Sequence, residues 1–391
     1  MRVLLTLGRL PKALELARAL WRGGARVTIA EPFATHLCKP SRAVARAIKV
    51  TPPALDQAGY IRDLEEAIRT ENIDLVVPVS EEALHASLLA PRLPPGVRLF
   101  GPDHHALARL HDKCAFIETA RRHGLSTPET FASNVTEAEA FAAHADYVLK
   151  PVHSCSGQGL RLRRAGEPLS PLDRAPGQIL QRRIYGRHIS SQSLALKGET
   201  LGTALYEGAI LSGTVAVAFR RIEAHPALEE WIARFVAAEA YSGFIAFDFI
   251  EDERGVWPLE CNPRLTSGLH FFEPADIAAA LLEAAPTRLR FKPQRDFVEW
   301  HTAMLETYSA LPDLGEFWRR LTVVRRAKDV LLDWSDPWPF FLMTASSWPV
   351  LRQVLTQGRS FGEAATADIL WRASAQVQTA SSEINGGAHA P

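Results

Sequence analysis

The sequence predicts a chain in which an α/β domain precedes two α+β lobes and a mostly helical C-terminal extension. Three observations lead to this prediction. Residues 1–105 alternate apolar strands with helices, residues 244–271 have the pattern of a β-hairpin, and helical segments follow residue 290. A chain of 391 residues is long enough for two or three domains with cores of their own.

The composition limits the classes of partner. Lys plus Arg and Asp plus Glu are balanced at 44 each, so charge gives no reason to expect nucleic acid or an anionic membrane as a partner. The four cysteines are scattered without a Cys-x-x-Cys pair, which fits a reduced protein. The first apolar run is too short for a signal peptide, and residues 337–351 are too short to span a bilayer. We therefore expect a cytoplasmic protein.

The first domain is expected to be a parallel sheet with helices on both faces. Strands are predicted at 3–7, 26–30 and 75–79, and a helix begins at Pro11. Gly8 and Glu31 stand where a dinucleotide site has a glycine and a ribose-binding acid, but the turn lacks the other two glycines. A dinucleotide site is therefore the less favoured interpretation.

The run Ser80-Glu81-Glu82 follows the end of a predicted strand and has two interpretations. Its side chains face a cleft, or Ser80 caps a helix, and the cap is the favoured one. Residues 102–128 are expected to form one helix that Gly124 stops, followed by an extended segment.

A buried strand at 147–151 carries one lysine, Lys150. A lysine in an apolar strand needs an anionic partner, because an unpaired buried ammonium costs several kcal/mol. The loop that follows contains Ser156, Gly157 and Gly159, and small residues of this kind expose backbone N–H groups that bind phosphate. The strand and loop together predict a phosphate site.

The hairpin is expected to have a polar turn at 251–255. Side chains two apart on a strand share a face, so Glu260, Asn262 and Arg264 point one way, with Asp248 directly across from Glu260. Two carboxylates ~4 Å apart repel by roughly 4 kcal/mol at an effective dielectric near 20. The pair predicts a cation, and oxygen ligands suit Mg²⁺. Taken alone, the hairpin leaves open an ordinary solvated surface.

The string Glu260-Cys261-Asn262-Pro263-Arg264, with Asp248 twelve positions before the Glu, resembles the metal hairpin of the ATP-grasp ligases. That superfamily includes biotin carboxylase, carbamoyl phosphate synthase and D-alanine:D-alanine ligase. The resemblance covers roughly residues 1–285. It implies an ATP-grasp fold with a pre-ATP-grasp N-terminal domain, and it implies ATP and two Mg²⁺ ions, with Mn²⁺ as an alternative, held by Asp248, Glu260 and Asn262.

The resemblance also implies roles for further residues. The residues expected to bind the nucleotide are Lys113, Lys150, Ser156, Gly157, Gly159, Gln181, Arg183, Ile184 and His188. Gln181 and His188 depart from the commoner pattern, which has Glu at both positions. Arg264 and Lys150 are expected to act in catalysis, and so is Arg220 at a strand end, for which a salt bridge at the rim is the equal alternative.

The expected domains are residues 1–105, an N-terminal domain; 106–185 and 186–290, the two ATP-grasp lobes; 291–375, the helical extension; and 376–391, a disordered tail. Five of the nine tryptophans follow residue 317. They are expected to pack the extension, with a lid over a substrate cleft as the alternative.

The function that follows from the resemblance is that of an ATP-dependent ligase. Such an enzyme activates a carboxylate as an acyl phosphate and joins it to an amine, releasing ADP and phosphate. A carboxylase or carbamoyl-phosphate-type enzyme that uses bicarbonate is one alternative, and a non-catalytic nucleotide-binding relative is another. The expected partners are small molecules, and a homodimer is left open.

Overall fold

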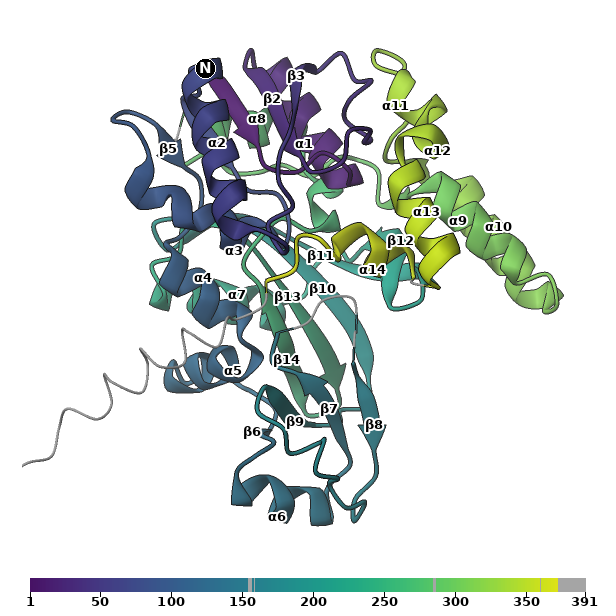
Figure 1. Ribbon diagram of the computed structural model, residues 1–391. Coiled ribbons are helices and arrows are strands. Elements are labelled where there is room, and N and C mark those ends of the chain that lie inside the picture. The colour runs from purple at the N-terminus through teal and green to yellow at the C-terminus, as the bar shows by residue number, and fades with distance from the viewer. Residues whose placement is uncertain (154–156, 158, 284–285, 359, 372–391) are drawn as a thin grey trace, which may run out of the picture.

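The computed structural model describes residues 1–153, 157, 159–283, 286–358 and 360–371. These residues form three β-sheets. Figure 1 shows the N-terminal sheet at the top, a small sheet at the bottom and a long sheet between them. The predicted tail at 376–391 lies outside the described residues.

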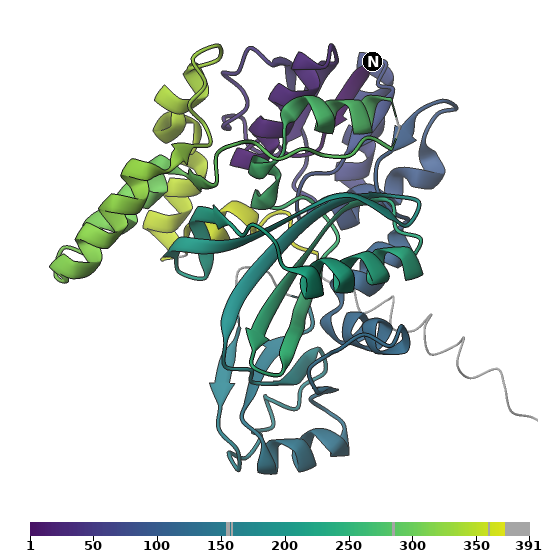
Figure 2. The same cartoon turned by 180° about the vertical axis from the view of Figure 1, so that it is seen from behind.

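The N-terminal sheet is parallel, as predicted, and has helices on both faces. α1 (Pro11–Arg22) and α8 (Pro274–Leu282) pack on one face, and α2 (Gln57–Glu71) packs on the other. α8 follows the β-hairpin in sequence and returns to cover this sheet (Figure 2). The strands follow the order β3 (Val44–Lys49), β2 (Arg26–Glu31), β1 (Arg2–Leu5), β4 (Leu75–Val77) and β5 (Arg98–Leu99).

The small sheet is antiparallel and is covered by α6 (Thr136–His144). Phe141 of α6 packs against Tyr147 and Leu149, the buried side chains of the strand that carries Lys150. The strands follow the order β6 (Thr130–Ala132), β9 (Gln178–Arg182), β7 (Tyr147–Pro151) and β8 (Arg161–Arg163).

The long sheet has one face packed with aromatic side chains and one face turned toward the N-terminal domain. On the first face, Trp231 and Phe235 of α7 (Pro226–Ala238) stack on each other and contact Phe247. The strands follow the order β14 (Gly255–Asn262), β13 (Gly243–Asp252), β10 (Arg187–Leu196), β11 (Glu199–Ser212), β12 (Val215–Arg221), β15 (Asp296–Val298) and β16 (Lys328–Asp329). The last two strands show that the C-terminal extension continues this sheet.

The predicted single helix at 102–128 is wrong, because two helices occupy this stretch. Asp112 has an extended backbone between α4 (His104–His111) and α5 (Lys113–Arg122), and its side chain accepts a hydrogen bond from Ala115 N at 2.8 Å. An aspartate that caps a helix in this way interrupts the preceding one. As a result Lys113 is the first residue of α5.

The strands β13 and β14 form the acidic hairpin, in which Asp248 pairs with Glu260 as predicted. The predicted five-residue turn is wrong, because the strands end at Asp252 and begin again at Gly255. The side chain of Asp252 accepts hydrogen bonds from the backbone N–H groups of Arg254 and Gly255 and closes this tighter turn. A bulge at Leu259 then shifts the register so that the two acids face each other.

The C-terminal extension is mostly helical, and α9 and α10 lie side by side (Figure 1). Its helices are α9 (Trp300–Ser309), α10 (Leu314–Arg326), α11 (Trp338–Phe341), α12 (Met343–Ser346), α13 (Trp348–Gln357) and α14 (Phe361–Thr366). The remaining short helices of the chain are α3 (Ala83–Ala86), η1 (Ser87–Arg92) and η2 (Ser267–Phe271). None of the helices in the described residues combines the length and the apolar character needed to cross a bilayer.

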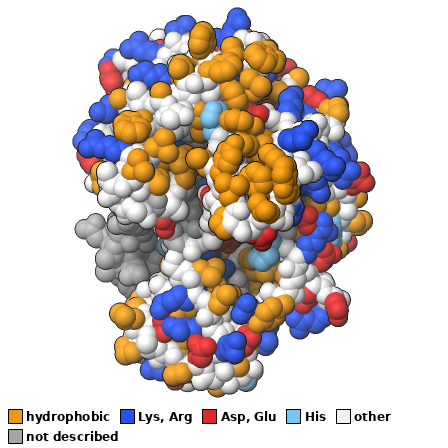
Figure 3. Space-filling view, turned by 90° about the vertical axis from the view of Figure 1, so that its right-hand side faces the viewer, with side chains coloured by type: hydrophobic (Ala, Val, Ile, Leu, Met, Phe, Trp, Pro, Cys, Tyr) orange, Lys and Arg blue, Asp and Glu red, His pale blue; other side chains and the backbone are white. Residues whose placement is uncertain are grey.

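The expectation that the late tryptophans pack the extension is wrong for four of them. Trp318, Trp334, Trp338 and Trp348 are exposed, because they lie on the outer sides of short helices or, for Trp334, in a loop. Figure 3 shows hydrophobic side chains gathered on the face of the molecule that carries the extension. Trp371 alone of the five packs inward, against the rings of two histidines.

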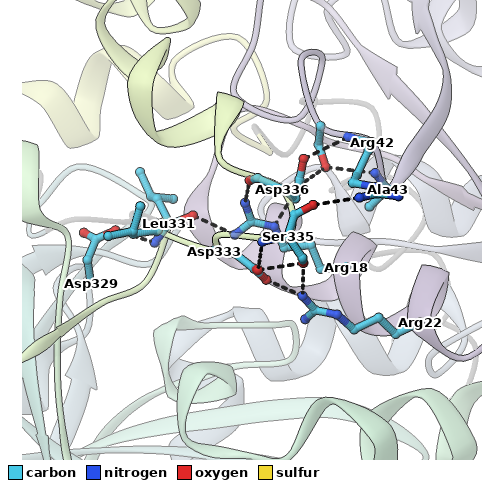
Figure 4. Close-up of polar contacts among 11 residues, drawn as sticks. Arg18, Arg22, Arg42, Ala43, Asp329, Leu331, Asp333, Ser335 and Asp336 are labelled. Atoms are coloured by element: carbon cyan, nitrogen blue, oxygen red, sulfur yellow. Dashed lines mark hydrogen bonds and ion pairs between the residues drawn. The ribbon is translucent and has the colours of Figure 1, made fainter.

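A buried ion pair fastens the extension to the N-terminal domain (Figure 4). Arg18 of α1 donates to Asp336 Oδ2 at 2.9 Å and to the carbonyl oxygens of Leu331 and Asp336, both at 2.7 Å. Ser41 Oγ and Arg42 N donate to the same carboxylate. The proline- and tryptophan-rich string after residue 332 is therefore held to the N-terminal domain through Asp336, with Arg18 as the buried cation.

Candidate active site

A cavity of about 310 Å³ lies where the N-terminal domain, the long sheet and the C-terminal extension meet. Asp248, Glu260 and Asn262 of the acidic hairpin line it, together with Arg264. Gly157, from the loop that follows β7, lines the same cavity. The structure thus brings the predicted metal residues and part of the predicted phosphate loop to one place.

The pKa values of Asp248 and Glu260, the two acids of the hairpin, are shifted in opposite directions. Burial and the neighbouring Glu260 raise the pKa of Asp248. Burial also raises the pKa of Glu260, but Lys113 and Lys150 more than offset this and leave it below its usual range. Ser190 Oγ donates to Asp248 Oδ1 at 2.6 Å. Glu260 is therefore the more readily ionised acid of the pair, and Asp248 keeps its proton to a higher pH.

Two buried lysines from different elements approach Glu260. Lys113 Nζ lies 3.2 Å from Glu260 Oε2. Lys150 Nζ donates to Gln181 Oε1 at 2.9 Å and to Leu259 O at 3.2 Å, so the bulge in β14 presents a carbonyl to it. Burial lowers the pKa of Lys150 to about 8, while the charge of Glu260 raises it. Both ammonium groups therefore lie against the acidic hairpin, although neither lysine is among the residues that line the cavity.

Asn262 and Arg264 continue the polar face of the hairpin toward the N-terminal domain. Asn262 Nδ2 donates to Asp248 Oδ2 at 3.1 Å, and Arg264 donates to Asn262 Oδ1 at 2.8 Å. Arg264 also pairs with Glu81 Oε1 at 2.5 Å. Burial opposes and Arg264 favours the ionised form of Glu81, so its pKa lies below the usual range. These contacts hold the guanidinium at the wall of the cavity.

The donor set fits a hard divalent cation that shares its coordination with a substrate. Asp248, Glu260 and Asn262 offer carboxylate and amide oxygens, which Mg²⁺ and Mn²⁺ prefer. Among the described residues, no three or more His, Cys, Asp or Glu side chains form a metal site by themselves. A cation here would therefore take further ligands from water or phosphate.

The predicted phosphate loop is described at two of its positions. Gly157 and Gly159 both have positive φ, and a Cβ at Gly159 would lie 2.9 Å from the Pro151 ring. Glycine is the residue that adopts this backbone without strain. Ser156 lies outside the described residues.

The predicted adenine and ribose residues are placed unequally. Gln181 is buried, accepts from Lys150 and donates to Thr130 Oγ1 at 3.1 Å, so it positions the lysine. Ile184 is buried nearby, and the guanidinium of Arg183 lies over the Tyr185 ring. His188 is exposed at the start of β10. None of these four contributes to the wall of the cavity described above.

The structure does not bring Arg220 to the site. Its side chain is exposed and donates to Asp296 Oδ1 at 2.7 Å, the rim salt bridge that was the alternative. Neighbouring residues on a strand face opposite sides, and Phe219 lines the cavity. Arg220 therefore faces away, and its predicted catalytic role is withdrawn.

Sequence reasoning missed several residues of the cavity. The favoured cap at Ser80 is wrong, because α3 has no side-chain cap and Ser80 lines the cavity with Glu81. Lys12 of α1 and Glu299 line it too. The strand end before Ser80 was the signal for Glu81, whereas Lys12 and Glu299 are isolated polar residues that reach the cavity only through tertiary packing.

The alternative of a dinucleotide site is not supported by the position of Glu31. Its carboxylate accepts hydrogen bonds from Gly8 N at 2.9 Å and Phe33 N at 3.1 Å and pairs with Arg9. Arg9 in turn pairs with Asp368 of the C-terminal segment. The carboxylate of Glu31, the acid that would bind a ribose, therefore has its hydrogen-bond partners within the chain.

The fold and the cluster of lysines and acids can now be compared with known proteins. Residues 110–268 match the family model of the ATP-grasp domain, so the chain carries an ATP-grasp domain and the resemblance predicted from the hairpin is confirmed. No curated protein sequence matched the chain.

Solved structures share the fold at low sequence identity. Biotin carboxylase from Campylobacter jejuni, in a complex with β,γ-ATP, has a TM-score of 0.60 and 17% identity, over 75% of this chain and 74% of that one. N5-carboxyaminoimidazole synthetase from Staphylococcus aureus, in a complex with ADP, has a TM-score of 0.59 and 14% identity, over 74% of this chain and 79% of that one. L-amino acid ligase from Bacillus licheniformis has a TM-score of 0.58 and 15% identity, over 76% of this chain and 78% of that one.

Proposed function

We propose that the protein is an ATP-dependent ligase that activates a carboxylate as an acyl phosphate and joins it to an amine. One observation supports this above the others: Lys113 and Lys150 approach Glu260, and Glu260 faces a second carboxylate, Asp248, at the wall of a cavity. Opposed acids of this kind are costly without a cation, and two lysines are costly without an anion. MgATP satisfies both needs.

The first step would transfer the γ-phosphoryl group. The bond between the γ-phosphorus and the β,γ-bridging oxygen breaks, a bond to a carboxylate oxygen of the substrate forms, and ADP leaves. Lys113 and Lys150 hold positive charge beside the phosphates. Asp248, Glu260 and Asn262 would hold Mg²⁺, which when bound neutralises charge on the phosphates. Arg264 lines the same wall and would orient the carboxylate.

The second step would form the C–N bond. The lone pair of an unprotonated amine attacks the acyl carbon, the C–O bond to phosphate breaks, and the nitrogen releases a proton. Phosphate leaves with the electron pair of that bond. Enclosure between the N-terminal domain and the extension keeps water from the acyl phosphate.

Release of ADP tests this function. Purified protein with MgATP is given a library of carboxylates paired with amines, and ADP is measured by a coupled assay. We expect ADP release that needs both substrates and falls to background with EDTA. ADP release with bicarbonate alone would favour the carboxylase alternative, and ATP binding without ADP release from any pair would favour a non-catalytic relative.

A further inference from the structure

The cavity has another acidic side chain, at the end that the C-terminal extension builds. Glu299 lies between β15 and α9, and its backbone N–H donates to Val217 O at 2.8 Å. Its side chain lines the cavity with Thr302 of α9 and Phe361 of α14. All three residues lie beyond the 110–268 match to the ATP-grasp domain. The extension therefore contributes side chains to this end of the cavity that the matched ATP-grasp domain does not supply.

The carboxylate of Glu299 is not used by the fold. No residue that the structure describes donates a hydrogen bond to it or forms an ion pair with it. The contrast is Asp329, its acidic neighbour, which accepts hydrogen bonds from the backbone N–H groups of Trp300, Leu331 and Leu332 at 2.9, 2.8 and 2.6 Å. Asp329 holds α9 in place, whereas Glu299 only faces the cavity.

The surroundings of Glu299 favour a bound cation. Burial and the charge of Asp329 raise the pKa of Glu299 to about 8, and Lys12, which lines the same cavity, lowers it only in part. Lys12 Nζ donates to Leu265 O at 2.6 Å, which directs it to the loop after the acidic hairpin. A cationic ligand would compensate this half-buried carboxylate, as a metal would compensate the acids of the hairpin.

The same end of the cavity also has apolar walls. Val217 and Phe219 of β12 form one side, and Leu10, Phe361 and Ala365 form another. A hydrated metal ion gains little from such walls, whereas an organic amine can bury its carbon atoms against them. The combination of one free carboxylate and apolar walls fits a primary amine with a small apolar group.

We propose that Glu299 is the counter-ion of a protonated amino group on a small apolar substrate, so that the C-terminal extension determines substrate specificity. The inference rests on the proposed function in taking this cavity as the place where substrate binds. The amino group belongs either to an amino acid, whose carboxylate then faces Arg264, or to a separate amine.

Matched sets of ligands test the inference by binding alone. One set is L-leucine, 3-methylbutylamine, which lacks the carboxylate, and 4-methylpentanoate, which lacks the amine. The corresponding sets from L-alanine and L-phenylalanine vary the apolar group. Binding to the full chain is measured by calorimetry and by thermal shift, with and without MgADP. The variants are Glu299→Gln, the conservative Glu299→Asp, and Glu253→Gln, an exposed acid of the hairpin turn, as control.

We expect amine-bearing members of at least one set to bind the wild type and the E253Q control, and to bind E299Q at least tenfold more weakly. E299D should fall between them. Binding of the acid without the amine should be the same in all four proteins. Tighter binding of the amino acid than of the bare amine identifies an amino acid as the source, and equal binding identifies a separate amine.

Three results would overturn the inference: no amine-dependent binding to the wild type in any set, equal binding of the deaminated acid, or unchanged binding in E299Q. Because no turnover is needed, these outcomes are independent of ADP release. Amine binding that depends on Glu299 without ADP release would contradict the proposed ligase and leave the inference standing.

Discussion

The chain buries charge in two regions that differ in how completely the protein satisfies it. At the junction of α1 and the extension, Arg18 and Asp336 are almost fully enclosed, and each of their polar atoms has a partner from the chain. At the acidic hairpin, Asp248 and Glu260 lie side by side on paired strands in the wall of a cavity. We call the first region the closed junction and the second the open cluster.

The difference teaches that a buried charge alone does not indicate a functional site. The closed junction pairs opposite charges and borders no cavity named above, so its charges stabilise the join between two parts of the chain. The open cluster places like charges together and leaves oxygen lone pairs toward space that a ligand can enter. We therefore expect substitutions in the first region to change stability and substitutions in the second to change chemistry.

The largest expected effect is on catalysis at the open cluster. Glu260→Gln removes the carboxylate that Lys113 contacts and weakens the hold on Mg²⁺. We expect ADP release to fall at least 10⁴-fold, about 5.4 kcal/mol of transition-state stabilisation. The melting temperature should change by no more than roughly 3 °C, because loss of the partner of Lys113 is offset by relief of the repulsion between Glu260 and Asp248. Unaltered turnover, or a protein that no longer folds, would remove the distinction between the two regions.

The next effect is on stability at the closed junction. Arg18→Ala leaves the carboxylate of Asp336 buried without its cation, and we expect the free energy of unfolding to fall by about 4 kcal/mol. Denaturant unfolding measures it. The control is Arg22→Ala, which breaks an exposed pair with Asp333 and should cost less than about 1 kcal/mol. ADP release by folded R18A at low temperature should match the wild type.

Ligand binding gives a smaller effect that belongs to the open cluster alone. MgATP at 100 times its dissociation constant should stabilise the wild type by ~2.7 kcal/mol, since it binds only the folded chain. Thermal shift measures it, and EDTA should remove most of it. Asp248→Asn should lose the metal-dependent part of this stabilisation. R18A should gain the full stabilisation from MgATP, starting from its own lower stability without ligand. An equal increment in D248N would contradict a metal at this hairpin.

The smallest predicted effect is the pH dependence of stability. Burial lowers the pKa of His85, which packs on Trp371, to about 4. The unfolded chain then binds more protons than the folded chain between pH 6.5 and 4, so stability falls as pH is lowered through this window. From pH 7 to 5 we expect a loss of about 2 kcal/mol from His85. In His85→Phe, denaturant unfolding at pH 7 and pH 5 should show a loss of stability that is smaller by this amount. An equal loss in the variant and the wild type would assign the pH dependence to other groups.

The acidic hairpin could be predicted from the sequence because its signal is local. Alternation with a period of two placed Asp248 and Glu260 on one face, and the pairing held even though the turn length was wrong. The error in the turn and the bulge at Leu259 compensate each other. The bulge leaves the Leu259 carbonyl without a partner strand, and Lys150 donates a hydrogen bond to it. Because Lys150 lies outside the hairpin, the hairpin sequence alone does not predict the bulge.

The far end of the cavity could not be predicted, because its residues meet only in the folded chain. Lys12 is separated from Glu299 by more than half of the sequence, and Phe361 belongs to a third element, α14. Each is a single residue without a motif. The predicted role of Arg220 could not be tested by the sequence for a related reason. Alternation along the strand shows that Arg220 faces away from Phe219, but packing decides which of the two faces borders a cavity.

The central claim is that Asp248 and Glu260 hold the metal of a bound nucleotide while Lys113 and Lys150 contact its phosphates. The most direct test is a crystal structure with Mn²⁺ and ADP, in which anomalous scattering locates the metal. We expect a peak within about 2.2 Å of oxygen atoms of both acids and of the nucleotide, with both lysine ammonium groups at hydrogen-bond distance from phosphate. A nucleotide bound elsewhere, or a metal that avoids both acids, would contradict the account.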